Sequence, residues 1–216
     1  FDMRGHGQSS PLPEGYWPTL ESLAEDTIRL MDALELETVH FVGESLGGLL
    51  GIWLGAQFPD RMKSLVLLST PVKVSPQGLA DFSAGADSWE SAFDRLSPAD
   101  WARQTMGHRF DPAETDPGYI EWAISQAGQT PVESLRRYAR LIENLDLSGG
   151  IPDVRRPTLM VSGGSKLAPP EQAQFLQKQI PGAQLELIPE ARHLVGYAMP
   201  EETAALAKAF WASLPE

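Results

Sequence analysis

The chain has 216 residues, enough to bury a sizeable core, and its 42% hydrophobic and 21% charged residues are typical of a globular protein. With 29 acidic and 17 basic residues, its net charge of −12 argues against nucleic acid and anionic membranes as partners. The sequence contains no cysteine, which excludes disulfides and thiolate chemistry, and no apolar run of transmembrane length. These features are compatible with a cytoplasmic location, which is our expectation.

Helical and strand-like patterns alternate along the first third of the chain. Apolar residues at helical spacing, with Thr19 as N-cap, predict a helix over 19–36. A short apolar run predicts a strand over 39–42, and helix-forming residues predict a buried helix over 46–58. A further apolar run predicts a strand over 65–68.

The middle of the chain has a different character. Residues 71–155 are rich in Pro, Asp, Ser and Trp, their helical patterns are short, and no strand is evident. The alternation then returns, with a strand predicted over 157–162, a helix over 170–180, a strand over 184–188 and a helix over 200–214.

Continuous apolar strands that alternate with helices predict an α/β fold with a mostly parallel sheet covered on both faces. We therefore divide the chain into a first core part (1–70), a helical cap or lid (71–155) and a second core part (156–216). The insertion is expected at the carboxyl ends of the strands, where open α/β sheets bind their ligands.

One serine lies between two glycines at the junction of a predicted strand and a predicted helix. The segment Gly43-Glu44-Ser45-Leu46-Gly47 has the G-x-S-x-G pattern of a nucleophile elbow in the context that this motif requires. The turn is so sharp that both flanking glycines are expected to be needed for space. The Ser45 hydroxyl would stand at a helix N-terminus, with the Leu46 N–H directed at a developing oxyanion. The alternative is a glycine-rich turn without a catalytic role.

A serine hydroxyl needs a base before it can act as a nucleophile. Of the four histidines, His193 follows the last predicted strand, in a loop expected at the same sheet edge as Ser45. His6 lies in a glycine turn and is expected to be structural. His40 lies within a strand, in or near the core, and His108 is expected at the surface or in the lid.

Several segments together resemble the α/β-hydrolase fold family. FDMRGHGQS at the start of the chain resembles the family's loop after its fourth strand, GESLGG resembles its elbow, and the loop around His193 resembles its histidine loop. The layout is similar to 3-oxoadipate enol-lactonases and small carboxylesterases, with carbon–carbon bond hydrolases close behind. The resemblance implies a serine hydrolase that cleaves an ester or lactone through Ser45 and His193 without a metal or organic cofactor.

The resemblance also implies elements that this sequence lacks. The family has strands before the RGHG loop, and the loop after one of them usually supplies the second oxyanion N–H. We therefore expect an N-terminally incomplete fold, with the elbow strand at an open edge of the sheet.

The family's third catalytic group is an aspartate in a pattern like G-x-x-D, and here the corresponding stretch is GGSK, with Lys166 in the expected place of the acid. Three alternatives follow. Another carboxylate reaches His193, with Glu171 the nearest in sequence, although Glu171 also suits the first turn of a helix. Ser165 or a water orients His193 in a slow dyad. Or the protein binds a ligand and does not hydrolyse it.

Aromatic residues of the insertion suit an apolar pocket above a nucleophile, and we assign Trp89, Trp101 and Trp122 to substrate binding. The alternative is that they form the core of the insertion itself. Glu44, beside the nucleophile, is too constrained by the elbow to be the acid; it is expected to contact the N-terminus of the helix that follows the elbow, the solvent or the substrate. The sequence predicts a small-molecule substrate and leaves its identity and the oligomeric state open.

Overall fold

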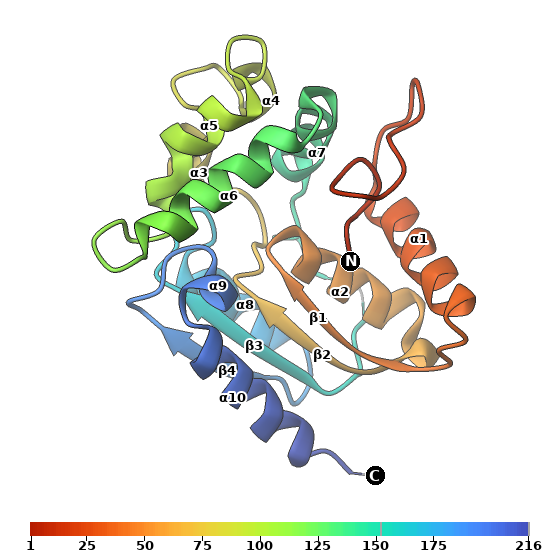
Figure 1. Cartoon of the computed structure of the whole chain (residues 1–216). Coiled ribbons are helices and arrows are strands. Elements are labelled where there is room, and N and C mark those ends of the chain that lie inside the picture. The colour runs from red at the N-terminus through yellow and green to blue at the C-terminus, as the bar shows by residue number, and fades with distance from the viewer. Residues whose placement is uncertain (152, 216) are drawn as a thin grey trace.

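A parallel sheet of four strands forms the centre of the fold (Figure 1). This computed structural model describes residues 1–151 and 153–215; position 152, within the predicted insertion, and position 216 lie outside the described residues. The strands are in sequence order across the sheet: β1 (Val39–Glu44), β2 (Met62–Leu68), β3 (Thr158–Gly163) and β4 (Gln184–Ile188).

Helices cover both faces of this sheet. On one face, α2 (Leu46–Gln57) packs against β1 and β2, α8 (Pro170–Gln179) packs against β3 and β4, and α1 (Leu20–Ala33) packs on α2. On the other face, α9 (Val195–Ala198) and α10 (Pro200–Ala212) bury Val195, Ala207 and Phe210 against apolar residues of β2 and β3. This arrangement confirms the predicted α/β fold with a parallel sheet.

Five helices form a layer beyond the carboxyl ends of the strands (Figure 1). We call them the helical layer: α3 (Pro76–Phe82), α4 (Trp89–Ala92), α5 (Pro98–Thr105), α6 (Pro117–Gln129) and α7 (Val132–Asn144). The layer has an apolar core of its own. Two short 3₁₀ helices, Pro59–Arg61 and Met106–His108, complete the list of helical elements in the described part of the chain. Because the layer follows β2 and precedes β3, it lies over the sheet edge that carries the elbow.

Local sequence signals set several helix ends. Thr19 caps α1 in a capping box with Ser22, and Ser75, Ser88 and Ser97 each accept a backbone N–H at the start of a helix in the layer. The predicted helices and strands of the core are all present, with ends shifted by a few residues. The short helix α9 was not predicted, because a single turn has no periodicity to detect.

The structure corrects the expectation for β1, which is buried on one side only. Phe41 and Gly43 face the core, whereas Val42 is 48% exposed and His40 is exposed. The reason is that β1 forms one edge of the sheet and that α10 reaches this face only with its last turn, where Trp211 lies 5.6 Å from the His40 ring. His40 is therefore a surface residue, and its Nδ1 lies 2.7 Å from Ser64 Oγ.

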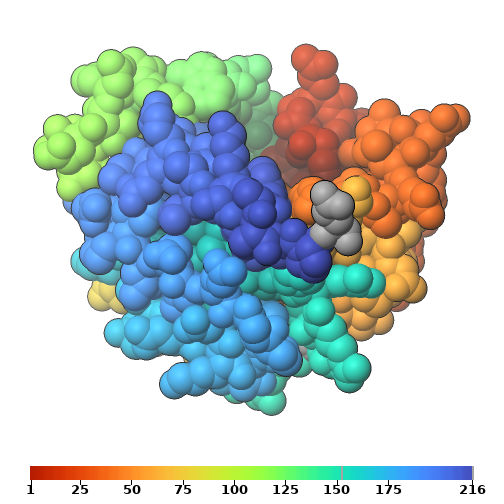
Figure 2. Space-filling view, turned by 90° about the horizontal axis from the view of Figure 1, so that it is seen from below, coloured from red at the N-terminus to blue at the C-terminus, as the bar shows by residue number. Residues whose placement is uncertain are grey.

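Figure 2 views the molecule from the side opposite the helical layer, and α10 and the preceding C-terminal segments, in blue, cover much of this surface beside the orange segments of α1 and α2.

No helix within residues 1–151 and 153–215 is both long and apolar enough to cross a membrane.

The turn from β1 into α2 requires glycine at one of its two flanking positions. A Cβ atom on Gly43 would lie less than 3.0 Å from the carbonyl oxygen of Gly47, closer than such atoms approach in proteins. A Cβ atom on Gly47 would meet no neighbouring atom within 4 Å. The sequence-based expectation that both positions must be small is therefore right for Gly43 and wrong for Gly47, because Cα–Cβ bonds at the two positions point in different directions.

We expect Gly43→Ala to destabilise the protein by about 1–3 kcal/mol, because the turn must open to accept the methyl group. The matched control Gly47→Ala should be neutral or should stabilise by about 0.5–1 kcal/mol, since alanine is favoured over glycine within a helix. Urea unfolding of both variants measures the difference. Equal stabilities would contradict the close approach of residues 43 and 47.

Candidate active site

Ser45 occupies the strained position of the elbow. Its backbone has φ 55° and ψ −113°, in a region that non-glycine residues rarely adopt, and its N–H donates to the carbonyl of Leu68 at 2.8 Å. The residue precedes α2 as its N-cap, but its hydroxyl does not cap the helix. The side chain is therefore available for a partner outside the turn.

That partner is His193, which lies 148 positions further along the chain. Its Nε2 lies 2.9 Å from Ser45 Oγ, and the ring is buried, with 4% exposure. The histidine loop between β4 and α9 can approach this closely because β3 ends at Gly163 and Gly164 follows it, and neither residue has a side chain. A Cβ on Gly163 would clash with the Arg192 carbonyl, and Gly164 N donates to Ala191 O at 2.6 Å.

The other imidazole nitrogen contacts a hydroxyl group. His193 Nδ1 lies 3.0 Å from the Oγ of Ser165, which is itself 3% exposed. The side chain of Lys166 is exposed, and Glu171 is exposed in the first turn of α8, where an acid complements the helix dipole. Of the alternatives that the sequence left open for this nitrogen, the structure places Ser165 there and not Glu171.

The surroundings of His193 disfavour its charged form. Burial, and secondarily the positive charge of Arg109, lower the pKa of the imidazole to about 3. The Arg109 guanidinium lies over the rings of Phe82 and Trp101, with its carbon 4.7 and 4.5 Å from their centroids, and donates to Thr105 Oγ1. Burial lowers the pKa of Arg109 itself to about 9. Arg109 was not predicted as a site residue, because no local pattern in the insertion relates it to the histidine loop.

A pocket of about 360 Å³ opens beside the elbow, and Leu46, the residue after the nucleophile, lines it. The N–H of Leu46 is at the first position of α2, where helices leave their N–H groups without an internal partner. Trp89 and Trp101 line the same pocket and also belong to the core of the helical layer. Trp122 is not among the lining residues; it is 51% exposed and stacks on Tyr119, with ring centroids 5.4 Å apart.

The remaining two histidines have structural contacts. His6 lines the pocket and packs edge-on against Tyr138, with ring centroids 4.7 Å apart. His108 lies in the helical layer with its Nδ1 3.3 Å from the carboxylate of Asp81. Within the described residues, no group of three or more His, Asp or Glu side chains is arranged to hold a metal ion.

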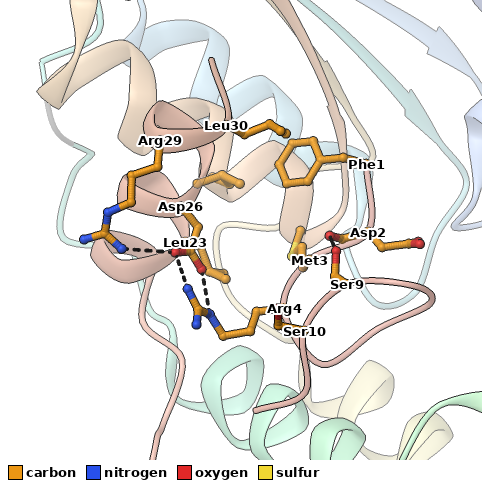
Figure 3. Close-up of a pocket in the computed structure, with 11 residues that line it drawn as sticks. Phe1, Asp2, Met3, Arg4, Ser9, Ser10, Leu23, Asp26, Arg29 and Leu30 are labelled. Carbon is orange, nitrogen blue, oxygen red and sulfur yellow. Dashed lines mark hydrogen bonds and ion pairs between the residues drawn. The ribbon is translucent and has the colours of Figure 1, made fainter. Parts of the chain in front are cut away.

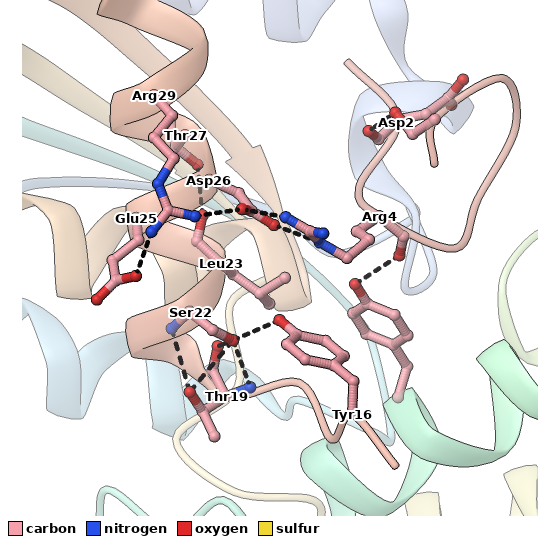
Figure 4. Close-up of polar contacts among 12 residues, drawn as sticks. Asp2, Arg4, Tyr16, Thr19, Ser22, Leu23, Glu25, Asp26, Thr27 and Arg29 are labelled. Carbon is pink, nitrogen blue, oxygen red and sulfur yellow. Dashed lines mark hydrogen bonds and ion pairs between the residues drawn. The ribbon is translucent and has the colours of Figure 1, made fainter. Parts of the chain in front are cut away.

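The N-terminal RGHG turn is fixed by contacts to α1 and α7 (Figure 4). Arg4 donates to both carboxylate oxygens of Asp26, at 2.9 and 2.6 Å, and the Tyr138 hydroxyl donates to the Arg4 carbonyl at 2.9 Å. A second hollow, of about 280 Å³, lies between this segment and α1 (Figure 3). It is lined by residues such as Phe1 and Leu30; Ser45 is not among the lining residues of this hollow or of the pocket that Leu46 lines.

Glu44 anchors the segment that follows the histidine loop. Its Oε1 accepts a hydrogen bond from Gly196 N at 2.9 Å, in the first turn of α9, a helix that was not predicted. Burial raises the pKa of Glu44 to about 7, against the smaller opposing effect of the Gly196 hydrogen bond. The carboxyl group therefore binds its proton more tightly in the folded protein than in the unfolded chain. Its contribution to stability is complete below about pH 4.5 and is lost as the pH rises through 7.

We expect Glu44→Gln to stabilise the protein at pH 8 more than at pH 5, by about 1–3 kcal/mol, because glutamine keeps an acceptor for Gly196 without carrying a charge. Urea unfolding at the two pH values measures this. Glu171→Gln, which removes an exposed carboxylate, controls for the change in net charge. A Glu44→Gln effect that is the same at both pH values would contradict the burial of this carboxyl group.

Known proteins resemble this chain over nearly its whole length. A 3-oxoadipate enol-lactonase of Acinetobacter baylyi is 26% identical over 99% of this chain and 78% of the relative. A crystal structure of a hydrolase from Pseudomonas aeruginosa superimposes with a TM-score of 0.84 at 29% identity, covering 98% of this chain and 78% of the other. The enol-lactonase from Burkholderia xenovorans superimposes with a TM-score of 0.81 at 26% identity, covering 98% and 79%.

The elbow, the histidine loop and the parallel sheet agree with the family comparison. The family described as the alpha/beta hydrolase fold matches residues 1–197, which include the RGHG turn, the elbow, the helical layer and the histidine loop. The chain therefore belongs to the α/β hydrolase fold family.

Proposed function

We propose that this protein is a serine hydrolase that cleaves a carboxylic ester or lactone of a small molecule. The observation that carries the proposal is the 2.9 Å contact between Ser45 Oγ and His193 Nε2. Leu46, the residue after Ser45, lines the adjacent pocket, whereas Ser45 and His193 are not among its lining residues. A serine held in a strained turn against a buried imidazole has no evident structural purpose, because the hydroxyl does not cap its helix.

In the proposed reaction, Ser45 Oγ attacks the carbonyl carbon of the substrate while His193 Nε2 takes the hydroxyl proton. The negative charge that develops on the carbonyl oxygen is stabilised by the Leu46 N–H at the N-terminus of α2. His193 then gives the proton to the leaving alcohol, and an acyl group remains on Ser45. A water molecule, activated by the same imidazole, releases the acid.

The relatives support an ester or lactone as the substrate class. Two of them are named enol-lactonases, and their likeness covers at least 98% of this chain. We further propose that the helical layer serves as a cap over the pocket, with Trp89 and Trp101 in contact with the substrate, and that the protein acts in the cytoplasm. Trp122 and Glu44 are less suited to contact the substrate, since one is exposed and the other bonds Gly196.

Turnover should be slow, because no carboxylate bonds His193 Nδ1 among the described residues. Replacing the acid of a Ser-His-Asp triad costs about 10⁴ in turnover, and the remaining groups still accelerate the reaction about 10³–10⁴-fold over water.

A second candidate function is ligand binding without hydrolysis. The observation that favours it is the same contact of Ser165 with Nδ1, where an active triad has a carboxylate. A fluorophosphonate probe separates the two candidates. Labelling of Ser45 supports the hydrolase, whereas a folded protein that remains unlabelled supports the binding module.

We expect the protein to hydrolyse p-nitrophenyl acetate and butyrate slowly and Ser45→Ala to abolish this activity, because the nucleophile is lost. Release of p-nitrophenol, followed at pH 8, measures both rates.

Ser10→Ala, which removes a hydroxyl from the N-terminal turn and leaves the elbow intact, serves as the control for purification and folding. Equal rates of hydrolysis by the wild-type protein and by Ser45→Ala would contradict the catalytic role of Ser45.

A further inference from the structure

The hydroxyl group of Ser165 has three hydrogen-bonding neighbours. Its Oγ lies 3.1 Å from Leu167 N, 3.2 Å from Ala168 N and 3.0 Å from His193 Nδ1. The two backbone N–H groups can only donate, and together they occupy both lone pairs of the hydroxyl oxygen. The hydroxyl proton is left for the third neighbour, so Ser165 donates to Nδ1 of His193.

This direction of donation decides where the imidazole carries its proton. A neutral imidazole has one protonated and one unprotonated nitrogen. Because Nδ1 accepts from Ser165, the proton is on Nε2, which lies 2.9 Å from Ser45 Oγ and donates to it. A general base needs the opposite arrangement, in which an unprotonated Nε2 accepts the proton of the nucleophile.

We propose that Ser165 is a positioning residue that holds His193 in the tautomer protonated on Nε2, so that the resting Ser45–His193 pair is oriented against activation of the nucleophile. The inference rests on the proposed function and identifies what limits it. It also implies that the resting Ser45 hydroxyl accepts a hydrogen bond from His193 Nε2. The proton of the Ser45 hydroxyl is then free to be donated to a bound ligand.

The other protonation states of His193 are disfavoured by the same surroundings. The doubly protonated ring is opposed by burial and by the charge of Arg109, which together keep the pKa near 3 and the ring neutral at physiological pH. The tautomer protonated on Nδ1 would direct three donors at Ser165 Oγ, which has two lone pairs. The tautomer protonated on Nε2 satisfies all three contacts.

An aspartate at position 165 would reverse this preference. A carboxylate only accepts, and its two oxygens offer about four lone-pair sites, enough for both backbone N–H groups and for a proton on Nδ1. Asparagine has nearly the same size, but its amide NH₂ group donates to Nδ1 and keeps the resting tautomer. Ser165→Asp and Ser165→Asn thus form a matched pair that differs in charge and in the direction of one hydrogen bond.

We expect Ser165→Asp to hydrolyse p-nitrophenyl butyrate about 10²–10⁴-fold faster than the wild-type protein, and Ser165→Asn to remain near the wild-type rate. The pH profile should change as well. In Ser165→Asp the carboxylate raises the pKa of His193, so the rate should rise with pH through a value nearer the ordinary histidine pKa of about 6.5. The wild-type rate should show no such step between pH 5 and 8, because the imidazole is already neutral there.

The tautomer is measured directly, without reference to activity, from ¹⁵N chemical shifts of the ring nitrogens in protein labelled with [¹⁵N]histidine, with His193→Gln to assign the signals. A protonated Nε2 in the wild-type protein supports the inference, whether or not the variants at position 165 fold. A protonated Nδ1 would overturn it, even if the protein hydrolyses esters well.

The two proposals fail in different ways. A protonated Nε2 in the wild-type protein, together with a folded Ser165→Asp that neither hydrolyses esters nor reacts with a fluorophosphonate, contradicts the hydrolase function and leaves the tautomer assignment supported. Equal hydrolysis by folded Ser165→Asp and Ser165→Asn, both well above background, would overturn the claim that Ser165 keeps His193 in a tautomer that cannot act as the base.

Discussion

The imidazole of His193 is held between two serine hydroxyls, and the chemistry of the site depends on how these two contacts share its single proton. Ser45 lies 2.9 Å from one nitrogen and Ser165 lies 3.0 Å from the other. Both serines are fixed by backbone contacts. The Ser45 N–H donates to the Leu68 carbonyl, and the Ser165 hydroxyl accepts hydrogen bonds from the N–H groups of Leu167 and Ala168. Neither hydroxyl position can adjust freely to a change in the protonation of the ring.

Burial disfavours charge throughout this region. The same loss of solvent raises the pKa of Glu44 to about 7 and lowers that of His193 to about 3, so both groups tend toward their neutral forms. Ester hydrolysis passes through an imidazolium and an oxyanion, and each requires a compensating charge or dipole in such surroundings. The N-terminus of α2 can serve the oxyanion. The imidazolium has no such compensation among the described residues. The positive charge of Arg109 disfavours it, and the group at Nδ1 is the neutral hydroxyl of Ser165.

The helical layer has a double role in this arrangement. Its aromatic residues form a core that stabilises the layer, and two of them, Trp89 and Trp101, also face the pocket beside the elbow. Arg109 packs against the rings of Phe82 and Trp101, and its positive charge lowers the pKa of His193. Packing of the layer and electrostatics of the site are therefore coupled through the same side chains.

The sequence by itself determined the α/β class, the strand–helix order of the core, the elbow at Ser45 and the choice of His193. These features depend on local periodicity and on glycine spacing, which are properties of neighbouring residues. Only the tertiary structure decided that Ser165 contacts Nδ1, that Arg109 lies near the ring, that Trp122 lies apart from the pocket and that His40 is exposed. Each of these depends on how segments up to about 150 positions apart meet at one sheet edge, and a hydrogen-bond partner or a neighbouring charge at that edge leaves no pattern in the local sequence.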